Sequence, residues 1–306
     1  SQFNLIIDCK HGATANTWQS LLNKLKITQY QLIHPTPLSS LGNITPNPTQ
    51  ISTLTQAQER QSQTPNSIII ANDPDGDRHV IIDEKGRLIT PEYVATIIIE
   101  FCVQNNIPTL GIASSLASSR ICRIITQNHN LSYFETPVGF KHIAPFLEKA
   151  RHQKKIAVGV ESSGGLALSC HTLEKCGFIP LIALLVIAKS TKKNLAELHD
   201  NILDHYPPLH FIEHTLHFQP KDKEKIKTKL FKANQTELTQ LFRKEISTIN
   251  TQDGIKITFQ NEEWICCRFS GTEPVARLYA ESSSTNLSQN LIHKLKSFLT
   301  NKTITS

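Results

Sequence analysis

The sequence predicts an α/β protein built from two consecutive α/β domains with mixed, largely parallel sheets, followed by a smaller α+β C-terminal domain. Three observations lead to this prediction. Short apolar runs alternate with amphipathic helical segments through residues 1–206, as they do in βαβ units. A proline pair then follows Tyr206 and indicates a boundary. Beyond it, several short strand-like segments are flanked by helices, which is typical of an α+β domain.

Length and composition agree with several soluble domains. The chain has 306 residues and a hydrophobic fraction of 39%, which is enough for more than one core. Its most apolar run, Ile179 to Ala188, is about half of the roughly 20 residues that a membrane helix needs. No signal-peptide pattern is present, so we expect a cytoplasmic protein without a membrane partner. The seven cysteines contain no CxxC pair and are expected to be buried free thiols.

The positive charge balance fits an anionic small substrate as well as a nucleic acid, and no dense basic run appears. The formal net charge is +6, which is mild for this length. In the most basic stretch, from Lys221 to Lys232, Asp222 and Glu224 interrupt the lysines at helical spacing. Such a pattern is typical of a solvated helix face, so we expect no nucleic-acid partner.

The first predicted domain comprises residues 1–90. Apolar runs predict its strands, helical spacing of apolar residues predicts its helices, and prolines mark the loop between residues 35 and 48. The expected elements are the strand Phe3–Ile7, the helix Asn16–Leu25, the strand Tyr30–Ile33, the helix Ile51–Arg60, and the strands Ser67–Ala71 and His79–Asp83.

The second predicted domain comprises residues 91–206 and repeats the layout of the first. Pro91 suits the first turn of a helix, and a glycine-rich turn follows the strand that ends at Val160. The expected elements are the helix Tyr93–Val103, the strand Thr109–Ala113, the helix Ser118–Gln127, the strand Tyr133–Glu135, a helix ending near Ala150, the strand Ile156–Val160 and the helix Phe178–Lys189.

The third predicted domain comprises residues 207–306. Short β-prone runs separated by turn residues predict strands, and Leu287, Leu291, Leu295 and Phe298 predict a final amphipathic helix. The other expected elements are the strand Phe211–His217, a charged helix from about Asp222, and the strands Gly254–Phe259, Glu263–Arg268 and Arg277–Glu281.

A cation-binding loop is predicted between two apolar strands of the first domain. Asp73, Asp75 and Asp77 alternate there and are followed by Arg78. Like charges this close repel one another unless a cation lies among them, and carboxylates are hard ligands that suit Mg²⁺ or Ca²⁺. Two alternatives stay open. One is a plain surface turn, and the other is an EF-hand with Glu84 at its twelfth position, although Arg78 occupies the place of the required glycine.

A candidate phosphate site begins at Arg268. Its guanidinium is followed by the hydroxyls of Ser270 and Thr272, and by Gly271, which lets the backbone approach a ligand closely. Arg277 on the next predicted strand offers a second guanidinium. The alternative is an ordinary hairpin rich in serine and glycine.

Further candidates follow strand ends of the second domain. Glu161 and Ser163 offer an acceptor and a donor-acceptor, which is the combination that sugar hydroxyls require. Gly139 and Lys141 follow another strand, and Lys175 lies in a later loop. Each is a weak signal alone, but ligands of open α/β sheets bind where strand ends open into loops. Together with the other two loops, these residues indicate a phosphosugar site.

These segments resemble those of the α-D-phosphohexomutases, the family of phosphoglucomutase and phosphomannomutase. The stretch Asp73–Arg78 is similar to that family's magnesium loop, Glu161–Gly164 to its sugar-binding loop, and Arg268–Pro274 to its C-terminal phosphate-binding loop. Thr136–Lys141 and Lys175 resemble family positions near the substrate. Order and spacing agree along the whole chain.

The resemblance implies an isomerase of carbohydrate metabolism, an intramolecular phosphotransferase that interconverts hexose 1-phosphate and hexose 6-phosphate through a phosphoserine and a hexose 1,6-bisphosphate. It implies Mg²⁺ held by the three aspartates, and a phosphorylated hexose as the partner. Arg78 would brace the transferring phosphoryl group, and Lys175 would be a general acid/base or a phosphate contact. The implied substrate-binding residues are Gly139, Lys141, Glu161, Ser163, Arg268, Ser270, Gly271, Thr272 and Arg277.

The chain departs from the family in one respect. No Thr-x-Ser-His-Asn-Pro motif, which carries the phosphoserine in that family, occurs in it, and Ser114, Ser115, Ser118 and Ser119 are interpreted as a helix cap. We therefore expect domains 2–4 of a mutase, inactive unless an N-terminal phosphoserine domain is supplied in cis. The alternatives are a non-catalytic phosphosugar-binding or regulatory remnant and a Ca²⁺-binding structural module. The residues do not choose among glucose, mannose and glucosamine phosphates.

Overall fold

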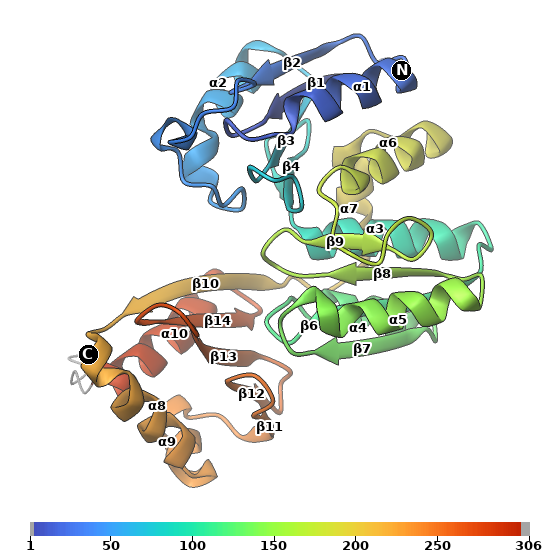
Figure 1. The fold of residues 1–306 in the computed structure, drawn as a ribbon. Helices are drawn as coiled ribbons and strands as arrows, with labels where there is room; N and C mark the ends of the chain where they lie inside the picture. Colours follow the sequence, from blue (N-terminus) through green and yellow to red (C-terminus); the bar gives the residue numbers. More distant parts are fainter. Residues whose placement is uncertain (1–2, 301–306) are drawn as a thin grey trace. The chain divides into compact units, whose positions relative to one another are not determined.

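The computed structural model describes residues 3–300 of the chain. These form two compact units, the first ending at Tyr206 and the second beginning at Pro207 (Figure 1). The first unit comprises the first and second predicted domains and holds two mixed, mostly parallel sheets. The second unit is the third predicted domain and holds an antiparallel sheet. The predicted fold class is confirmed.

The first sheet brings three parallel strand ends to one edge. Its strands lie in the order β2-β1-β3-β4-β5, with β1 parallel to β2 and β3, and β4 antiparallel to both of its neighbours. Ile6, Ile69 and Val80 pack on one face against Leu54 and Ala57. Its elements are β1 (Asn4–Asp8), α1 (Ala15–Leu25), β2 (Tyr30–Ile33), 3₁₀ turns at Leu41–Asn43 and Ile51–Leu54, α2 (Thr55–Gln63), β3 (Ser67–Asn72), β4 (His79–Ile82) and β5 (Leu88–Ile89).

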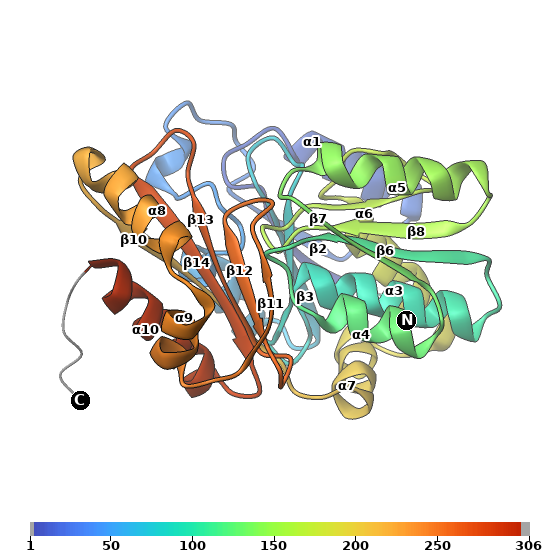
Figure 2. The same ribbon diagram turned by 90° about the horizontal axis from the view of Figure 1, so that it is seen from below.

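The second sheet has the order β7-β6-β8-β9, in which only β9 runs antiparallel to its neighbour. Figure 2 shows α5 on one side of this sheet and α3 and α4 on the other. Ile143 and Leu147 of α5 pack against Ala113 and Ala157 of the sheet. The elements are α3 (Pro91–Gln104), β6 (Thr109–Ser115), α4 (Ile121–Asn128), β7 (Ser132–Thr136), α5 (Phe140–His152), β8 (Ile156–Val160), β9 (Leu166–Leu168), α6 (Ile179–Thr191) and α7 (Leu195–His205).

Charged side chains join the turn after β4 to the start of α7. Both carboxylate oxygens of Glu84 accept hydrogen bonds from α7, one from the Leu195 N–H at 3.1 Å and one from the Ala196 N–H at 2.8 Å. Beside it, Arg87 forms an ion pair with Asp200 of α7. A carboxylate at a helix N-terminus satisfies unpaired N–H groups and meets the positive end of the dipole. Glu84 therefore serves α7, and the EF-hand alternative is wrong.

We expect Glu84→Gln to destabilise the first unit by about 1 kcal/mol, because it removes a charge and one acceptor from the N-terminus of α7. Chemical denaturation at neutral pH measures this change. Glu59→Gln is the matched control, since Glu59 lies exposed on α2. Equal denaturation midpoints for the two variants would contradict the role given to Glu84.

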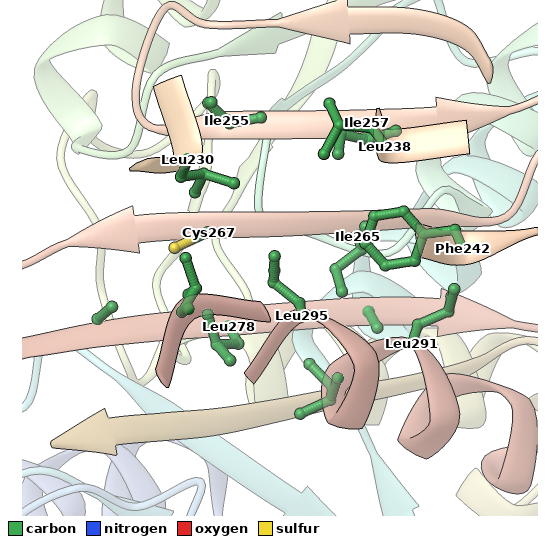
Figure 3. Packing of buried hydrophobic residues seen from close by; sticks show 14 of the residues in the cluster. Leu230, Leu238, Phe242, Ile255, Ile257, Ile265, Cys267, Leu278, Leu291 and Leu295 are labelled. Atoms are coloured by element: carbon green, nitrogen blue, oxygen red, sulfur yellow. The ribbon is translucent and has the colours of Figure 1, made fainter. Parts of the chain in front are cut away.

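The second unit packs three helices against one face of its sheet. The strand order is β10-β14-β13-β12-β11, and every pair is antiparallel. In Figure 3, Leu230, Phe242 and Leu295 from these helices meet Ile265 and Leu278 of the sheet. The elements are β10 (His210–His217), a 3₁₀ turn at Pro220–Asp222, α8 (Lys223–Lys232), α9 (Gln235–Phe242), β11 (Ile246–Asn250), β12 (Ile255–Phe259), β13 (Trp264–Phe269), β14 (Val275–Ser282) and α10 (Thr285–Thr300).

Several sequence-based expectations need correction. Helix α4 begins at Ile121, because the four buried serines before it belong to the end of β6 and the turn that follows; within them only the Ser119 hydroxyl accepts a bond from the first helical N–H, at 3.3 Å. The segment after Ile51 starts as a 3₁₀ turn, and α7 was not predicted. Cys170 is exposed and Cys176 half-buried, so the expectation of buried thiols is wrong for these two.

Among the described residues, no helix is long and apolar enough to cross a membrane.

Candidate active site

The aspartate loop joins the buried strands β3 and β4 at the edge where the parallel strands end. Asp73 is buried, Asp77 half-buried and Asp75 exposed, and ligand atoms of all three lie within 4.8 Å of one another. The backbone N–H of Arg78 donates to Asp73 Oδ1 at 2.9 Å, and its Nε contacts Oδ2. All three carboxylates predicted for a metal site thus converge, and Arg78 is bonded to one of them, Asp73.

The loop fits a hard divalent cation. Burial raises the pKa of the Asp73 carboxyl to about 6, although hydrogen bonds from Arg78 act in the opposite direction. Within the described part of the chain, Asp77 Oδ1 is buried and accepts no hydrogen bond. Carboxylates that are crowded and partly buried are stabilised by a cation such as Mg²⁺. The donor set therefore suits a metal ion.

The turn after β1 packs against the aspartate loop. The Ala13 N–H donates to the Pro74 carbonyl at 2.7 Å, and a Cβ on Gly12 would lie 2.2 Å from that carbonyl oxygen. Only a glycine allows the two backbones to approach this closely. The close contact holds the middle of the aspartate loop against the β1–α1 turn.

Lys175 reaches the aspartate loop from the second domain. Its Nζ lies 2.8 Å from Asp77 Oδ2. Burial lowers the pKa of Lys175, but the hydrogen bond and charge of Asp77, together with the charge of Glu161, outweigh it and leave the pKa raised. The side chain is therefore held as an ammonium, which suits a proton donor or a phosphate contact better than a base.

The predicted sugar-binding segment follows β8. Glu161 is buried, and its Oε1 accepts a hydrogen bond from the Gly139 N–H at 2.7 Å. Ser163 is half-buried in the same turn. Lys141 lies exposed in the first turn of α5. The structure thus brings Glu161 and Gly139 together, and the Lys141 Cγ lies 3.9 Å from the position that a Cβ on Gly139 would occupy.

The loop at Arg268 belongs to the second unit. Arg268 lies directly opposite Arg277 in the β13–β14 pair, so the two side chains share a face. Asp253 binds the Arg268 guanidinium at 3.0 and 2.9 Å. The Ser270 hydroxyl accepts from the Thr272 N–H at 3.3 Å, which organises the turn.

The Arg268 loop has one further cation beside it, and part of it is open to solvent. The Lys223 Nζ donates to the Ser270 carbonyl at 2.6 Å, a cation that the sequence did not indicate. A Cβ added to Gly271 would meet nothing within 4 Å, so the backbone there is open to a ligand. Arg277 is 47% exposed and lies 3.4 Å from Glu213. The arrangement offers cations and turn amides suited to an anion.

Family models match the chain in three segments. The phosphoglucomutase/phosphomannomutase alpha/beta/alpha domain II model matches residues 1–86, the alpha/beta/alpha domain III model matches residues 90–206, and the C-terminal domain model matches residues 220–296. The chain belongs to the phosphoglucomutase/phosphomannomutase family. The resemblance inferred from its loops is confirmed.

Individual relatives agree with this family. The chain is 25% identical to a phosphoglucomutase/phosphomannomutase of Thermococcus kodakarensis, over 92% of this chain and 57% of that protein. It is 24% identical to phosphoglucomutase 1 of Drosophila melanogaster, over 90% of this chain and 53% of that protein. The chain thus spans little more than half the length of these relatives.

Solved structures show the same fold. A phosphoglucomutase/phosphomannomutase family protein from Burkholderia thailandensis superposes with a TM-score of 0.77 at 18% identity, over 98% of this chain and 60% of that one. The open form of the Paramecium phosphoglucomutase parafusin gives a TM-score of 0.76 at 19% identity, over 98% and 58%.

The sequence analysis did not single out three residues beside the candidate site, which are Asn72, His79 and Gly177. Asn72 and His79 flank the aspartate loop, and Gly177 follows Lys175 by two residues. Asn72 and His79 are fully buried although polar. Their position next to a predicted ligand loop was the available signal, but their partners lie in the second domain, far away in sequence.

Proposed function

We propose that this chain supplies the metal-binding, sugar-binding and phosphate-binding parts of a phosphohexomutase, which interconverts hexose 1-phosphate and hexose 6-phosphate. The observation that carries the proposal is the contact of Lys175 with Asp77, at 2.8 Å. It joins a cation of the second domain to a carboxylate cluster of the first, close to Glu161, whose charge acts on Lys175. Carboxylates for a metal, a fixed ammonium and a hydroxyl acceptor are what phosphoryl transfer to a sugar requires.

The proposed chemistry proceeds through a bisphosphorylated sugar. A phosphoserine gives its phosphoryl group to the free hydroxyl of the hexose phosphate. The motif that carries this phosphoserine does not occur in the sequence, so a further domain would supply it. The resulting hexose 1,6-bisphosphate reorients and returns its other phosphoryl group to the serine. The ring stays intact, and each transfer exchanges one P–O bond for another.

Residues of the first unit act on the reacting phosphate. Mg²⁺, bound by Asp73, Asp75 and Asp77, would neutralise charge on the phosphoryl oxygens. Arg78, held against Asp73, would brace the transferring group, and Lys175 would donate a proton to the leaving oxygen or contact a phosphate. The side chains of Arg78 and Lys175 are held in position before substrate binds, so little reorganisation of the site is required.

Other residues are proposed to recognise the rest of the substrate. Glu161, with Ser163 in the same turn, would bind ring hydroxyls. Arg268, Ser270, Gly271, Thr272 and Arg277 would bind the non-reacting phosphate, and Gly139 and Lys141 would add contacts near the sugar. A phosphorylated hexose as substrate fits a cytoplasmic location, which we propose as well.

Binding and turnover test this proposal separately. We expect the 306-residue chain to bind glucose 1,6-bisphosphate in calorimetric titrations with Mg²⁺, and to show no binding of glucose under the same conditions. We expect no conversion of glucose 1-phosphate to glucose 6-phosphate in a coupled assay, because no phosphoserine motif is present to carry the phosphoryl group. Failure to bind the bisphosphate would contradict the proposed function, and clean turnover would contradict the expected inactivity.

A non-catalytic phosphosugar-binding or regulatory role is the second candidate. The upstream coding sequence separates the two candidates, because an in-frame Ser-His-Asn-Pro segment would support the enzyme.

A further inference from the structure

Asn72, at the end of β3, connects the aspartate loop to the segment that carries Lys175. Its side chain is fully buried. Its Oδ1 accepts from the Trp18 indole N–H at 2.7 Å, which fixes the orientation of the amide because an indole can only donate. Its Nδ2 then donates to the Arg78 carbonyl at 2.9 Å and to the Gly177 carbonyl at 3.0 Å. One amide thus closes the loop and fastens it to the second domain.

The packing at this junction leaves little freedom. The Gly177 N–H donates to the Gly76 carbonyl at 2.9 Å. A Cβ on Gly177 would lie 2.4 Å from both the Arg78 carbonyl oxygen and the Asn72 amide nitrogen. The segment that carries Gly177 therefore packs directly against the aspartate loop. Because Lys175 lies two residues before Gly177, this contact also fixes the position of Lys175.

His79, at the other end of the loop, makes the corresponding connection to the sugar-binding turn. It is fully buried, and its Nδ1 lies 2.6 Å from the Gly164 carbonyl oxygen. Because a carbonyl only accepts, Nδ1 carries the proton. The His79 backbone N–H donates to the same oxygen at 2.9 Å, and Arg78 pairs with Gly165 as an isolated antiparallel bridge. The turn that carries Glu161 and Ser163 is thus attached to the aspartate loop.

We propose that Asn72 and His79 are positioning residues: Asn72 sets the position of Lys175, and His79 sets the position of the hydroxyl-binding turn, both relative to the aspartate loop. The inference rests on the proposed function, since it assigns a purpose to the geometry of that site. Both side chains are fully buried, and each donates a hydrogen bond to a backbone carbonyl of the second domain, so both act through the segments that they hold. Their effects differ in kind, because Lys175 would act on phosphate and Glu161 on ring hydroxyls.

The experiment compares two probes that share phosphates but differ in hydroxyls, glucose 1,6-bisphosphate and 1,6-hexanediol bisphosphate. Calorimetric titration of the 306-residue chain with each gives a selectivity ratio. His79→Leu should lose about tenfold of the selectivity for the sugar, because the turn loses a buried hydrogen bond that holds it. His79→Asn should restore most of it, since the Asn amide nitrogen can occupy the place of Nδ1.

Asn72→Ala should instead weaken binding of both probes by about the same factor, tenfold or more, with the selectivity ratio unchanged. Trp18→Phe is the matched control. It removes the partner of Oδ1 but leaves both Nδ2 bonds, so it should lower the thermal unfolding midpoint while both affinities stay within about twofold.

The outcomes separate this inference from the proposed function. Wild-type chain that fails to bind glucose 1,6-bisphosphate, or binds both probes equally, would overturn the proposed function. If the wild-type chain is selective and the His79→Leu variant is equally selective, the positioning role of His79 is overturned while the proposed function stands. If Trp18→Phe weakens binding as much as Asn72→Ala does, the positioning role of Asn72 is overturned. The His79 series decides the question even if Asn72→Ala does not fold.

Discussion

Gly12→Ala is expected to destabilise the first unit by about 3 kcal/mol, the upper range for overpacking in a dense interior. Its new methyl group would lie 2.2 Å from the Pro74 carbonyl oxygen and 2.3 Å from the Pro74 Cα. Both atoms belong to the backbone of the aspartate loop, so no side-chain rotation relieves the clash. The loop must shift, or the turn after β1 must open, and either change breaks the 2.7 Å bond from the Ala13 N–H.

Urea denaturation measures this effect, and Gly271→Ala is the matched control. The same methyl group at Gly271 meets nothing within 4 Å, so we expect a change within about 0.5 kcal/mol. We also expect Gly12→Ala to weaken magnesium binding, because the three carboxylates move with the loop. A wild-type denaturation midpoint for Gly12→Ala would show that the loop is more compliant than its packing indicates.

Asp77→Asn is expected to have the largest effect on activity. In a protein that joins this chain to a phosphoserine domain, we expect kcat to fall by roughly 10²–10³, the range for losing one preorganised electrostatic group. The substitution removes a metal ligand and the carboxylate that holds Lys175 at 2.8 Å. Without that carboxylate the pKa of Lys175 falls, because burial then dominates.

Asp200→Asn provides the control, since it makes the same charge change on α7, where Asp200 pairs with Lys85 and Arg87. We expect it to cost stability but to leave both kcat and magnesium affinity unchanged. Coupled assays at several magnesium concentrations give both quantities. Wild-type kcat in Asp77→Asn would remove Asp77 from the proposed site.

Local patterns predicted the fold class because each of its signals lies within a few residues. The run Ile68–Ile70 is a buried strand in the structure as well, and the final helix begins at Thr285 with Leu291 and Leu295 in its core. Helix α7 was missed although its signal is present: Asn194 and Glu197 form a capping box. Helix α4 was started too early, because serines satisfy a turn as readily as a helix cap.

The candidate site divides in the same way. The aspartate loop was predictable, since three carboxylates within five residues repel one another wherever they fold, and they do converge in the structure. The loops at Glu161 and Arg268 were recognisable because their residue types suit hydroxyls and phosphate. Their roles, like those of Lys141 and Arg277, stay proposals.

By itself, then, the sequence determined the class of fold and the family, and it indicated the loops that we propose to carry the chemistry, since these follow from short-range periodicity and residue type. Tertiary structure alone decided which loops meet. Asn72 and Gly177 are 105 residues apart, and His79 and Gly164 are 85 apart. Contacts over such separations leave no local pattern, because they arise only when loops of the two domains meet and bury polar groups that must then find partners. The composition of the aspartate loop predicts a cation site, and the contacts of the loop with its neighbours support the proposed phosphosugar site.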